Sequence, residues 1–400
     1  MLFFEGGNIL GNYIEPSKLY YSEIFPNGVY THCENQVVPL PIPDTLNKVK
    51  NTQIVKNILT HKLFFCKKIY ISSSKQKDVL ISEILYPSSH VASWPVDLIK
   101  IEKIDENKHI DIVDLRHLYC DEYHNVQEYA ANYILLFPYY ENDSTCRGGY
   151  AYYTPLDAWL KNEPITQKNY KNNNIKRICV SIVHALNKVN KDGYTYFDFN
   201  LSRFMLKPDF TVVPEYTNLI MNKDLTNKKI TKELSLQYGL IPLDFIEPFV
   251  YLSNSTQQSN GRTEKTILFN MSTQNYSLAA MLFYLMFGRK PYEGNRLMQN
   301  QDDIDDNVSH YAYLRNLYLK DENIHFIFDN SYDNPNLLTD EYTDMFATEI
   351  GLWNECPKEL RKIFTNTLNR QNTLRESYVR APKPDSWVHL FDSLGWGNLI

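Results

Sequence analysis

The sequence predicts an α+β protein with a small strand-rich N-terminal lobe and a larger helical C-terminal lobe. Two apolar runs, LFFCKKIY at 63–70 and YILLF at 133–137, predict strands in the first part, because short aromatic-rich runs bounded by turn residues are typical of strands. Beyond residue 149 the apolar residues recur at helical spacing over longer segments. The polar stretch at 138–148 lies between the two patterns and predicts a hinge.

Length and charge restrict the class of protein. The 400 residues are enough for two domains, and we expect lobes at 1–140 and 141–400. The formal net charge of −6 excludes a general attraction for nucleic acid or an anionic membrane. The longest apolar run, at 278–288, is about half the ~20 residues that cross a bilayer, so it predicts a buried helix rather than a membrane span.

Targeting signals and cysteines point to the same compartment. The N-terminal MLFFEGG lacks the basic flank of a secretory signal, so we expect the chain to begin where it is written and to stay in the cytoplasm. The six cysteines show no CxxC pattern and no histidines at metal-ligand spacing. We therefore expect reduced thiols rather than a zinc site or a disulfide framework.

A helix follows the first strand. Residues 78–86 place apolar side chains at helical spacing, and Pro87 ends the pattern. A strand that carries Lys68 is thus followed by a helix that carries Glu83. The region before the strand, which includes PLPIPD at 39–44, is interpreted as an N-terminal extension and an insertion.

The C-terminal part begins with a strongly amphipathic pattern at 174–190. Two short apolar runs at 204–206 and 211–213, separated by a Lys-Pro-Asp turn, predict a hairpin. The segment 277–287 is apolar all round, which predicts a helix in the centre of a domain. The polar, acidic stretch near 295–350 is interpreted as an insertion that forms a solvated loop.

This order of elements, with Tyr-Phe-Asp at 196–198 on a loop before the hairpin, resembles the protein kinase family. The segments TQNYSLA at 273–279 and MLFYLMFGRKPYEG up to residue 294 resemble the central helix of the family and the turn after it. Residues 353–364 and 380–387 resemble its closing helices, and SWPVDL at 93–98 is similar to a segment of a divergent bacterial branch. The resemblance implies a bilobal kinase-like fold and ATP as the cofactor.

The resemblance also implies roles for single residues. Lys68 would hold the α and β phosphates and pair with Glu83, and Asp198 would orient the attacking hydroxyl. Lys67 could take the place of Lys68, because adjacent strand residues face opposite ways. Glu215 stands where the family has its metal-binding aspartate, and is the expected ligand of magnesium.

Four departures from the family pattern bear on activity. Arg203 replaces an asparagine that binds the second magnesium, Glu215 an aspartate, Thr217 a glycine and Gln274 an aspartate. A GxGxxG phosphate loop is absent. The candidates for it are GGNILG at 6–11 and PNGVY at 26–30, and each also fits a simple turn.

The arginine changes the chemistry most. A guanidinium has only donors and a permanent positive charge, so Arg203 cannot ligate magnesium. At about 4 Å it would repel each unit of positive charge by about 4 kcal/mol at an effective dielectric near 20. The same group grips phosphate oxygens bidentately, so Arg203 is expected to replace a magnesium ion at the nucleotide.

Two main functions remain open at this point, beside a non-kinase enzyme or a nucleotidyl transfer on the same scaffold. The departures favour a pseudokinase that binds a nucleotide, a protein partner or both in a regulatory role. The retained Asp198 favours an active, atypical ATP-dependent Ser/Thr protein kinase with a protein substrate. The aromatic residues at 311–328 predict either a docking surface or a cover for the helical lobe.

Overall fold

The computed structural model describes residues 19–32, 54–71, 74–92, 94–101, 131–139, 154–164, 169–216, 220–222, 228–231, 266–269, 271–294, 326–330, 334, 337–338, 343–369 and 381–400. The chain forms two compact units. The strand-rich unit contains Leu2–Thr154 and Pro214–Asn218, and the helical unit contains Pro155–Val213 and Leu219–Ile400. The α+β prediction is therefore confirmed. Residues 140–153 lie outside the described parts, so the expected lobe boundary stays a prediction.

The strand-rich unit is built on a six-stranded antiparallel sheet with the order β1-β2-β3-β4-β6-β5. Its strands are β1 (Leu19–Tyr21), β2 (Val29–His32), β3 (Ile54–Asn57), β4 (Leu63–Ile71), β5 (Asp97–Ile101) and β6 (Ala131–Tyr139). A bridge between Ser22 and Ile99 joins the end of β1 to β5. The first and last strands of the sheet thus meet, which leaves the sheet curled upon itself. Three of its strands come from before residue 63, the region interpreted as an extension and an insertion.

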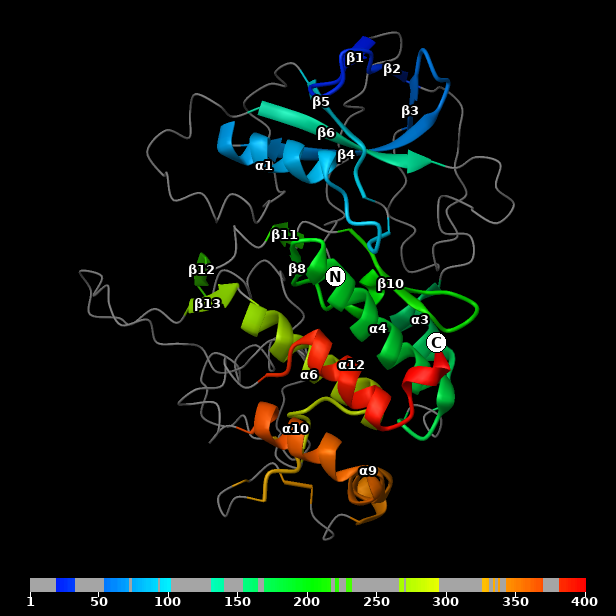
Figure 1. Cartoon of the computed structure of the whole chain (residues 1–400), viewed down its shortest axis with the longest axis vertical. Helices are drawn as coiled ribbons and strands as arrows, with labels where there is room; N and C mark the ends of the chain where they lie inside the picture. The colour runs from blue at the N-terminus through cyan, green and yellow to red at the C-terminus, as the bar shows by residue number, and fades with distance from the viewer. Residues whose placement is uncertain are drawn as a thin grey trace, which may run out of the picture. The chain divides into compact units, whose positions relative to one another are not determined.

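The two faces of this sheet bury different clusters, because side chains alternate along a strand. One cluster lies inside the curl and contains Tyr20, Tyr30, Val55, Cys66, Ile99, Ile134 and Leu136. The other packs the single described helix of the unit, α1 (Ser74–Leu85), against the sheet and contains Leu80, Ile84, Leu98, Tyr133 and Leu135. Figure 1 shows α1 lying along the strands β4 and β6.

The helical unit has α6 (Met271–Phe287) in its core, and nearly all of its described side chains are buried. The other helices are α3 (Leu156–Asn162), α4 (Asn173–Lys191), α9 (Thr343–Glu355), α10 (Lys358–Leu368) and α12 (Pro384–Ser393), with short 3-10 helices η4 (Leu201–Arg203) and η7 (Gly397–Leu399). Its strands are β7 (Thr154–Pro155), β8 (Tyr194–Tyr196), β9 (Phe204–Leu206), β10 (Val212–Pro214), β11 (Ile220–Asn222), β12 (Lys228–Thr231) and β13 (Thr266–Phe269). The predicted helices at 174–190 and 277–287 and the predicted hairpin are confirmed by α4, α6 and the pair β9–β10.

The apolar pattern of α4 explains its place against the hairpin. Its buried face runs from Ile175 to Val189 and includes the polar residue Ser181. Ser181 forms hydrogen bonds to the backbone of β10. The Ser181 hydroxyl accepts a hydrogen bond from the Val212 amide at 2.6 Å and donates one to the Val212 carbonyl at 3.3 Å. The helix therefore fixes the strand that leads away from the loop containing Asp198.

Aromatic residues of the expected insertion are part of the core. Phe326 and Phe328 are buried, and Phe328 stacks on Trp353 with ring centroids 4.5 Å apart. Phe326 packs edge-on against Phe283 of α6. For these two residues the docking interpretation is wrong and the covering alternative is confirmed. Tyr311, Tyr313 and Tyr318 lie outside the described residues.

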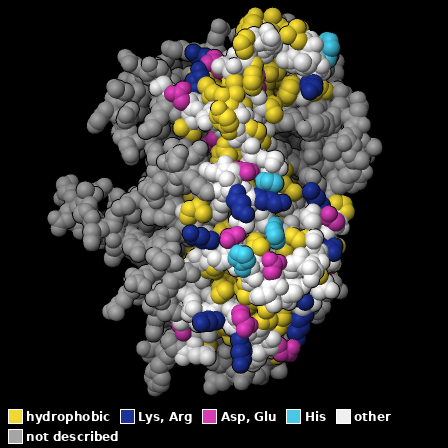
Figure 2. Space-filling model, in the orientation of Figure 1, with side chains coloured by type: hydrophobic (Ala, Val, Ile, Leu, Met, Phe, Trp, Pro, Cys, Tyr) yellow, Lys and Arg dark blue, Asp and Glu magenta, His cyan; other side chains and the backbone are white. Residues whose placement is uncertain are grey.

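The described surface differs between the units. Exposed large hydrophobic side chains in the described residues are Leu19, Tyr21, Phe25, Ile58, Leu59, Leu85, Tyr86 and Ile400, all but the last in the strand-rich unit. Figure 2 shows hydrophobic side chains gathered over that unit, and basic, acidic and histidine side chains interspersed over the helical unit. No helix in the described part of the chain is long and apolar enough to cross a membrane.

Candidate functional site

Glu83 is a buried carboxylate on α1. The Tyr216 hydroxyl donates a hydrogen bond to its Oε2 atom at 3.2 Å. The indole nitrogen of Trp94 donates to the Glu83 backbone carbonyl at 2.8 Å. A buried carboxylate needs such donors, because burial without hydrogen bonds strongly disfavours the charge. The site residue on α1 is therefore held by the side chains of two aromatic residues.

The segment that carries Glu215 is fastened within the strand-rich unit. The Ala92 amide donates to the Pro214 carbonyl and the Tyr216 amide donates to the Ala92 carbonyl, each at 2.8 Å, which forms a parallel bridge between Ala92 and Glu215. The Tyr216 ring packs against Trp94 and Phe137 at centroid distances of 5.0 and 6.0 Å. The backbone of Glu215, the residue directly after β10, is thus fixed.

The two candidate lysines occupy opposite faces of β4. The Cα partner of Lys68 in β6 is Ile134, a residue of the cluster inside the curled sheet. The Cα partner of Lys67 is Leu135, a residue of the cluster that packs α1. Positions paired across an antiparallel ladder share a face. The register therefore puts the Lys67 position on the face that bears the helix of Glu83. The side chains of both lysines, and with them the expected Lys68–Glu83 ion pair, lie outside the described residues.

In the helical unit the loop after β8 is held by Gln274. This fully buried residue of α6 accepts a hydrogen bond at its Oε1 atom from the Tyr196 amide, at 2.8 Å. A neutral amide oxygen is as able as a carboxylate to accept from a backbone N–H. The replacement of the family aspartate by Gln274, which counted against activity in the sequence, therefore leaves a working anchor for the loop.

The loop itself is shaped by short-range hydrogen bonds. The Asp198 carboxylate accepts from the Asn200 amide at 3.3 Å. Asn200 in turn caps η4, accepting from the Ser202 amide at 3.1 Å and from the Ser202 hydroxyl at 2.9 Å. Asn and Asp favour such local bonds to the backbone of the residues that follow. The cap sets the direction of η4, whose last residue is Arg203.

Arg203 turns back toward Asp198. Its Nε atom lies 3.9 Å from Asp198 Oδ2, and the two side chains are only 19% and 7% exposed. The distance is that of an ion pair rather than a hydrogen bond. Because water screens a pair this buried only weakly, each charge offsets the other. The loop thus carries its own cation beside the aspartate that the resemblance makes catalytic.

This arrangement does not suit a magnesium ion at Asp198. Mg²⁺ requires oxygen ligands in near-octahedral geometry, and a guanidinium beside the carboxylate supplies only donors and a like charge. The part of the chain that the structure describes holds no group of three or more His, Cys, Asp or Glu side chains that could bind a metal ion. The expected ligand Glu215 is half-buried, in the strand-rich unit. No chemical step through a metal follows from these residues.

Among the other predicted positions, residues 26–30 comprise a turn at Pro26–Asn27, Gly28, and the first two residues of β2. The Gly28 amide donates to the Phe25 carbonyl at 2.9 Å, which closes a β-turn between β1 and β2. Whether this turn contacts phosphate stays a prediction. Residues 6–11 and Thr217 lie outside the described residues. All three cysteines of the described parts, Cys66, Cys179 and Cys356, are buried and lie outside any disulfide, and burial raises the pKa of the Cys356 thiol to about 12.

Sequence reasoning missed Tyr216, Lys77 and Asp97. Tyr216 contacts Glu83 from 133 positions away, and the hydroxyl of a tyrosine gives no signal of its own in the sequence. Asp97 was visible as a lone acid beside the apolar run of β5. A buried acid of that kind requires hydrogen-bond donors, which was the available clue.

Comparisons with known proteins add the following. No known protein family matches the sequence, and no curated protein matches it. Among solved structures, a ROP18 kinase domain in complex with AMP-PNP and sucrose is similar over 96% of this chain and 86% of that chain, at 10% identity and a TM-score of 0.41. The element order described above, from β4 to the buried helix α6, is the order that the resemblance in the sequence implies.

Proposed function

We propose that this chain is a protein kinase-like pseudokinase that binds a nucleotide such as ATP without a divalent metal and acts in a regulatory role on a protein partner. One observation carries the proposal, namely the ion pair between Arg203 and Asp198. In a kinase-like site this arginine would put a fixed cation beside the carboxylate, where phosphotransfer requires a metal ion. Arginine is also the side chain best suited to grip phosphate oxygens.

A specific observation favours the alternative of an active, atypical Ser/Thr protein kinase. Gln274 still anchors the Tyr196 amide, so the loop of Asp198 keeps its support from α6. In that alternative Asp198 would orient the substrate hydroxyl, and Glu215 with a lysine of β4 would act on the nucleotide. The two functions differ in what Asp198 contributes.

Calorimetric titration with ATP in EDTA, repeated in magnesium, distinguishes them. We expect the wild type to bind ATP in EDTA.

Arg203→Asn should weaken that affinity by about 10- to 150-fold, because it removes a charged hydrogen bond of about 1.5–3 kcal/mol. Asp198→Asn should strengthen metal-free binding, since it removes a negative charge beside the phosphates. Arg177→Asn is the matched control and should leave the affinity unchanged, because Arg177 is a half-buried residue of α4 that donates to the Asp209 carbonyl.

Binding that requires a divalent cation in the wild type would contradict the pseudokinase proposal. Transfer of labelled phosphate to a protein by the wild type, with no transfer by Asp198→Asn, would also contradict it. That result would establish the active alternative. A loss of metal-free binding in Asp198→Asn would show that the aspartate, not the arginine, holds the nucleotide.

A further inference from the structure

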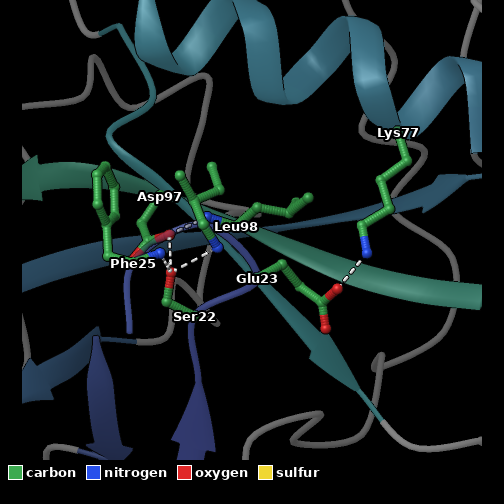
Figure 3. Close-up of polar contacts among 7 residues, drawn as sticks. Ser22, Glu23, Phe25, Lys77, Asp97 and Leu98 are labelled. Carbon is green, nitrogen blue, oxygen red and sulfur yellow. Dashed lines mark hydrogen bonds and ion pairs between the residues drawn. The ribbon is translucent and has the colours of Figure 1, made fainter. Parts of the chain in front are cut away.

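The turn between β1 and β2 is tied to the rest of its unit by a buried carboxylate. Asp97 of β5 accepts hydrogen bonds from the Ser22 hydroxyl at 2.6 Å, from the Tyr30 hydroxyl at 2.5 Å and from the Leu98 amide at 2.7 Å. Ser22 uses the same oxygen to accept from the amides of Ile24 and Phe25, at 3.0 and 2.7 Å. Figure 3 shows the contacts of the Ser22 hydroxyl with Asp97 and with the amide of Phe25. The turn is therefore fixed in one conformation.

Gly28 is required for this close approach. A Cβ atom at Gly28 would lie 2.4 Å from the Ser22 Cβ atom and 3.1 Å from Asp97 Oδ2. No side chain fits there without movement of the turn. The glycine that the sequence suggested for phosphate contact thus serves the packing of the turn on Asp97.

The residue next to Ser22 reaches the helix. The Glu23 amide donates to the Leu98 carbonyl at 2.8 Å, which leaves its carboxylate directed at the Lys77 ammonium of α1, with which it forms an ion pair (Figure 3). Both side chains are about three-quarters shielded from water. The Lys77 ammonium also lies 5.5 Å from the centre of the Tyr133 ring. Burial alone would lower the pKa of Lys77, but its hydrogen bond to Glu23 and the neighbouring charges raise it, so the lysine remains charged.

Helix α1 is consequently held at two points. Lys77 and Glu83 are six residues apart, which is about 9 Å along a helix that rises 1.5 Å per residue. Glu23 holds the first point, and Tyr216 and Trp94 hold the second. The apolar side chains between them, Leu80 and Ile84, pack on the sheet but do not by themselves stop a helix from sliding along an apolar face.

We propose that the β1–β2 turn is a strut that positions α1, and that Glu23 and Lys77 are positioning residues for the Glu83 carboxylate. Ser22, Gly28 and Asp97 keep the strut rigid. Any role of Glu83 in nucleotide binding rests on the function proposed above, whereas the strut itself does not. The chain thus sets the place of its own helix through residues 22–28, a segment upstream of the strand that bears the candidate lysines.

Amide hydrogen exchange of the full-length protein tests the strut directly. Glu23→Gln and Lys77→Met should each speed exchange in residues 76–86 by about two- to fivefold, the range expected for a partly shielded ion pair. The reversed pair Glu23→Lys with Lys77→Glu should restore the wild-type rate. Gly28→Ala should speed exchange in the same peptide although it removes no charge. Glu355→Gln, which breaks the exposed Lys171–Glu355 pair of the helical unit, is the matched control and should leave α1 unchanged.

A second readout separates positioning from general stability. With 5-fluorotryptophan incorporated, the Trp94 resonance, assigned by Trp94→Phe, should shift in Glu23→Gln and return in the reversed pair, because its indole bonds to the Glu83 carbonyl. Unchanged α1 exchange in both single variants would overturn the proposal, and so would an equal increase in α1 and in peptides of α4. If the wild type binds no nucleotide, the function proposed above fails, while exchange and the Trp94 resonance still decide on the strut.

Discussion

At the residue scale, Gln274 shows that a changed side chain can keep its contact. Its buried amide oxygen accepts from the Tyr196 amide. In Gln274→Leu this backbone N–H would be buried without a partner, which costs about 1–3 kcal/mol. We expect that loss in the free energy of unfolding measured by urea denaturation, and a value within about 0.5 kcal/mol of the wild type would show that the contact contributes nothing.

The isosteric variant Gln274→Glu provides the control for the same contact. A buried carboxyl has its pKa raised in the folded protein, because burial disfavours the charged form. The folded state then binds a proton that the unfolded state has lost, so stability is present at low pH and is lost as pH rises through the folded pKa. Gln274→Glu should therefore approach wild-type stability at low pH and fall below it at neutral pH.

At the scale of elements, periodicity predicted the longer elements of the structure but few of the short strands. The helix at 174–190 was recognisable because its apolar residues follow one face, and that face is buried in α4. The central helix was recognisable because α6 is apolar all round. The first three strands were not recognised, because β1, β2 and β3 have only three or four residues each and too few positions to show an alternation.

Strand register is the element-scale detail that the sequence could not decide. Lys67 and Lys68 are adjacent, so an error of one residue in the register of β4 exchanges the faces on which the two lysines lie. The register puts the Lys67 position, paired with Leu135, on the face of the sheet that packs α1. In the ATP titration we expect Lys67→Met to weaken binding about 10-fold or more, as for loss of a charged hydrogen bond, and Lys68→Met to have the smaller effect. The reverse order of the two variants would restore Lys68 to the role the resemblance implied.

At the scale of the whole molecule, the contacts that hold the candidate site join distant parts of the chain. Tyr216 and Glu83 are 133 positions apart, and Tyr30 and Asp97 are 67 apart. Local patterns predict elements but carry no information on such pairs, which form only when the elements pack. The sequence therefore supplied Glu83, Asp198 and Arg203 as candidates, while the neighbours that orient them came from the structure.

The contact between Tyr216 and Glu83 makes the strand-rich unit depend on a segment that lies, in the sequence, between two parts of the helical unit. Pro214–Asn218 belongs to the strand-rich unit although residues on both sides of it do not. Tyr216→Phe keeps the ring between Trp94 and Phe137 and removes only the hydroxyl, so it should cost about 0.5–1.5 kcal/mol. Tyr216→Ala also removes the packing and should cost about 3–5 kcal/mol, as large-to-small aromatic changes do.

These losses should appear in one unit. By hydrogen exchange with mass spectrometry, Tyr216→Ala should speed exchange in α1, β5 and β6, because the Tyr216 ring and hydroxyl pack against Glu83, Trp94 and Phe137. Peptides of α4 and α6 should keep their wild-type rates, since the contacts of those helices lie within the helical unit. Equal acceleration in both sets of peptides would instead show that the 400 residues open as a single cooperative unit, with Tyr216 contributing to its global stability.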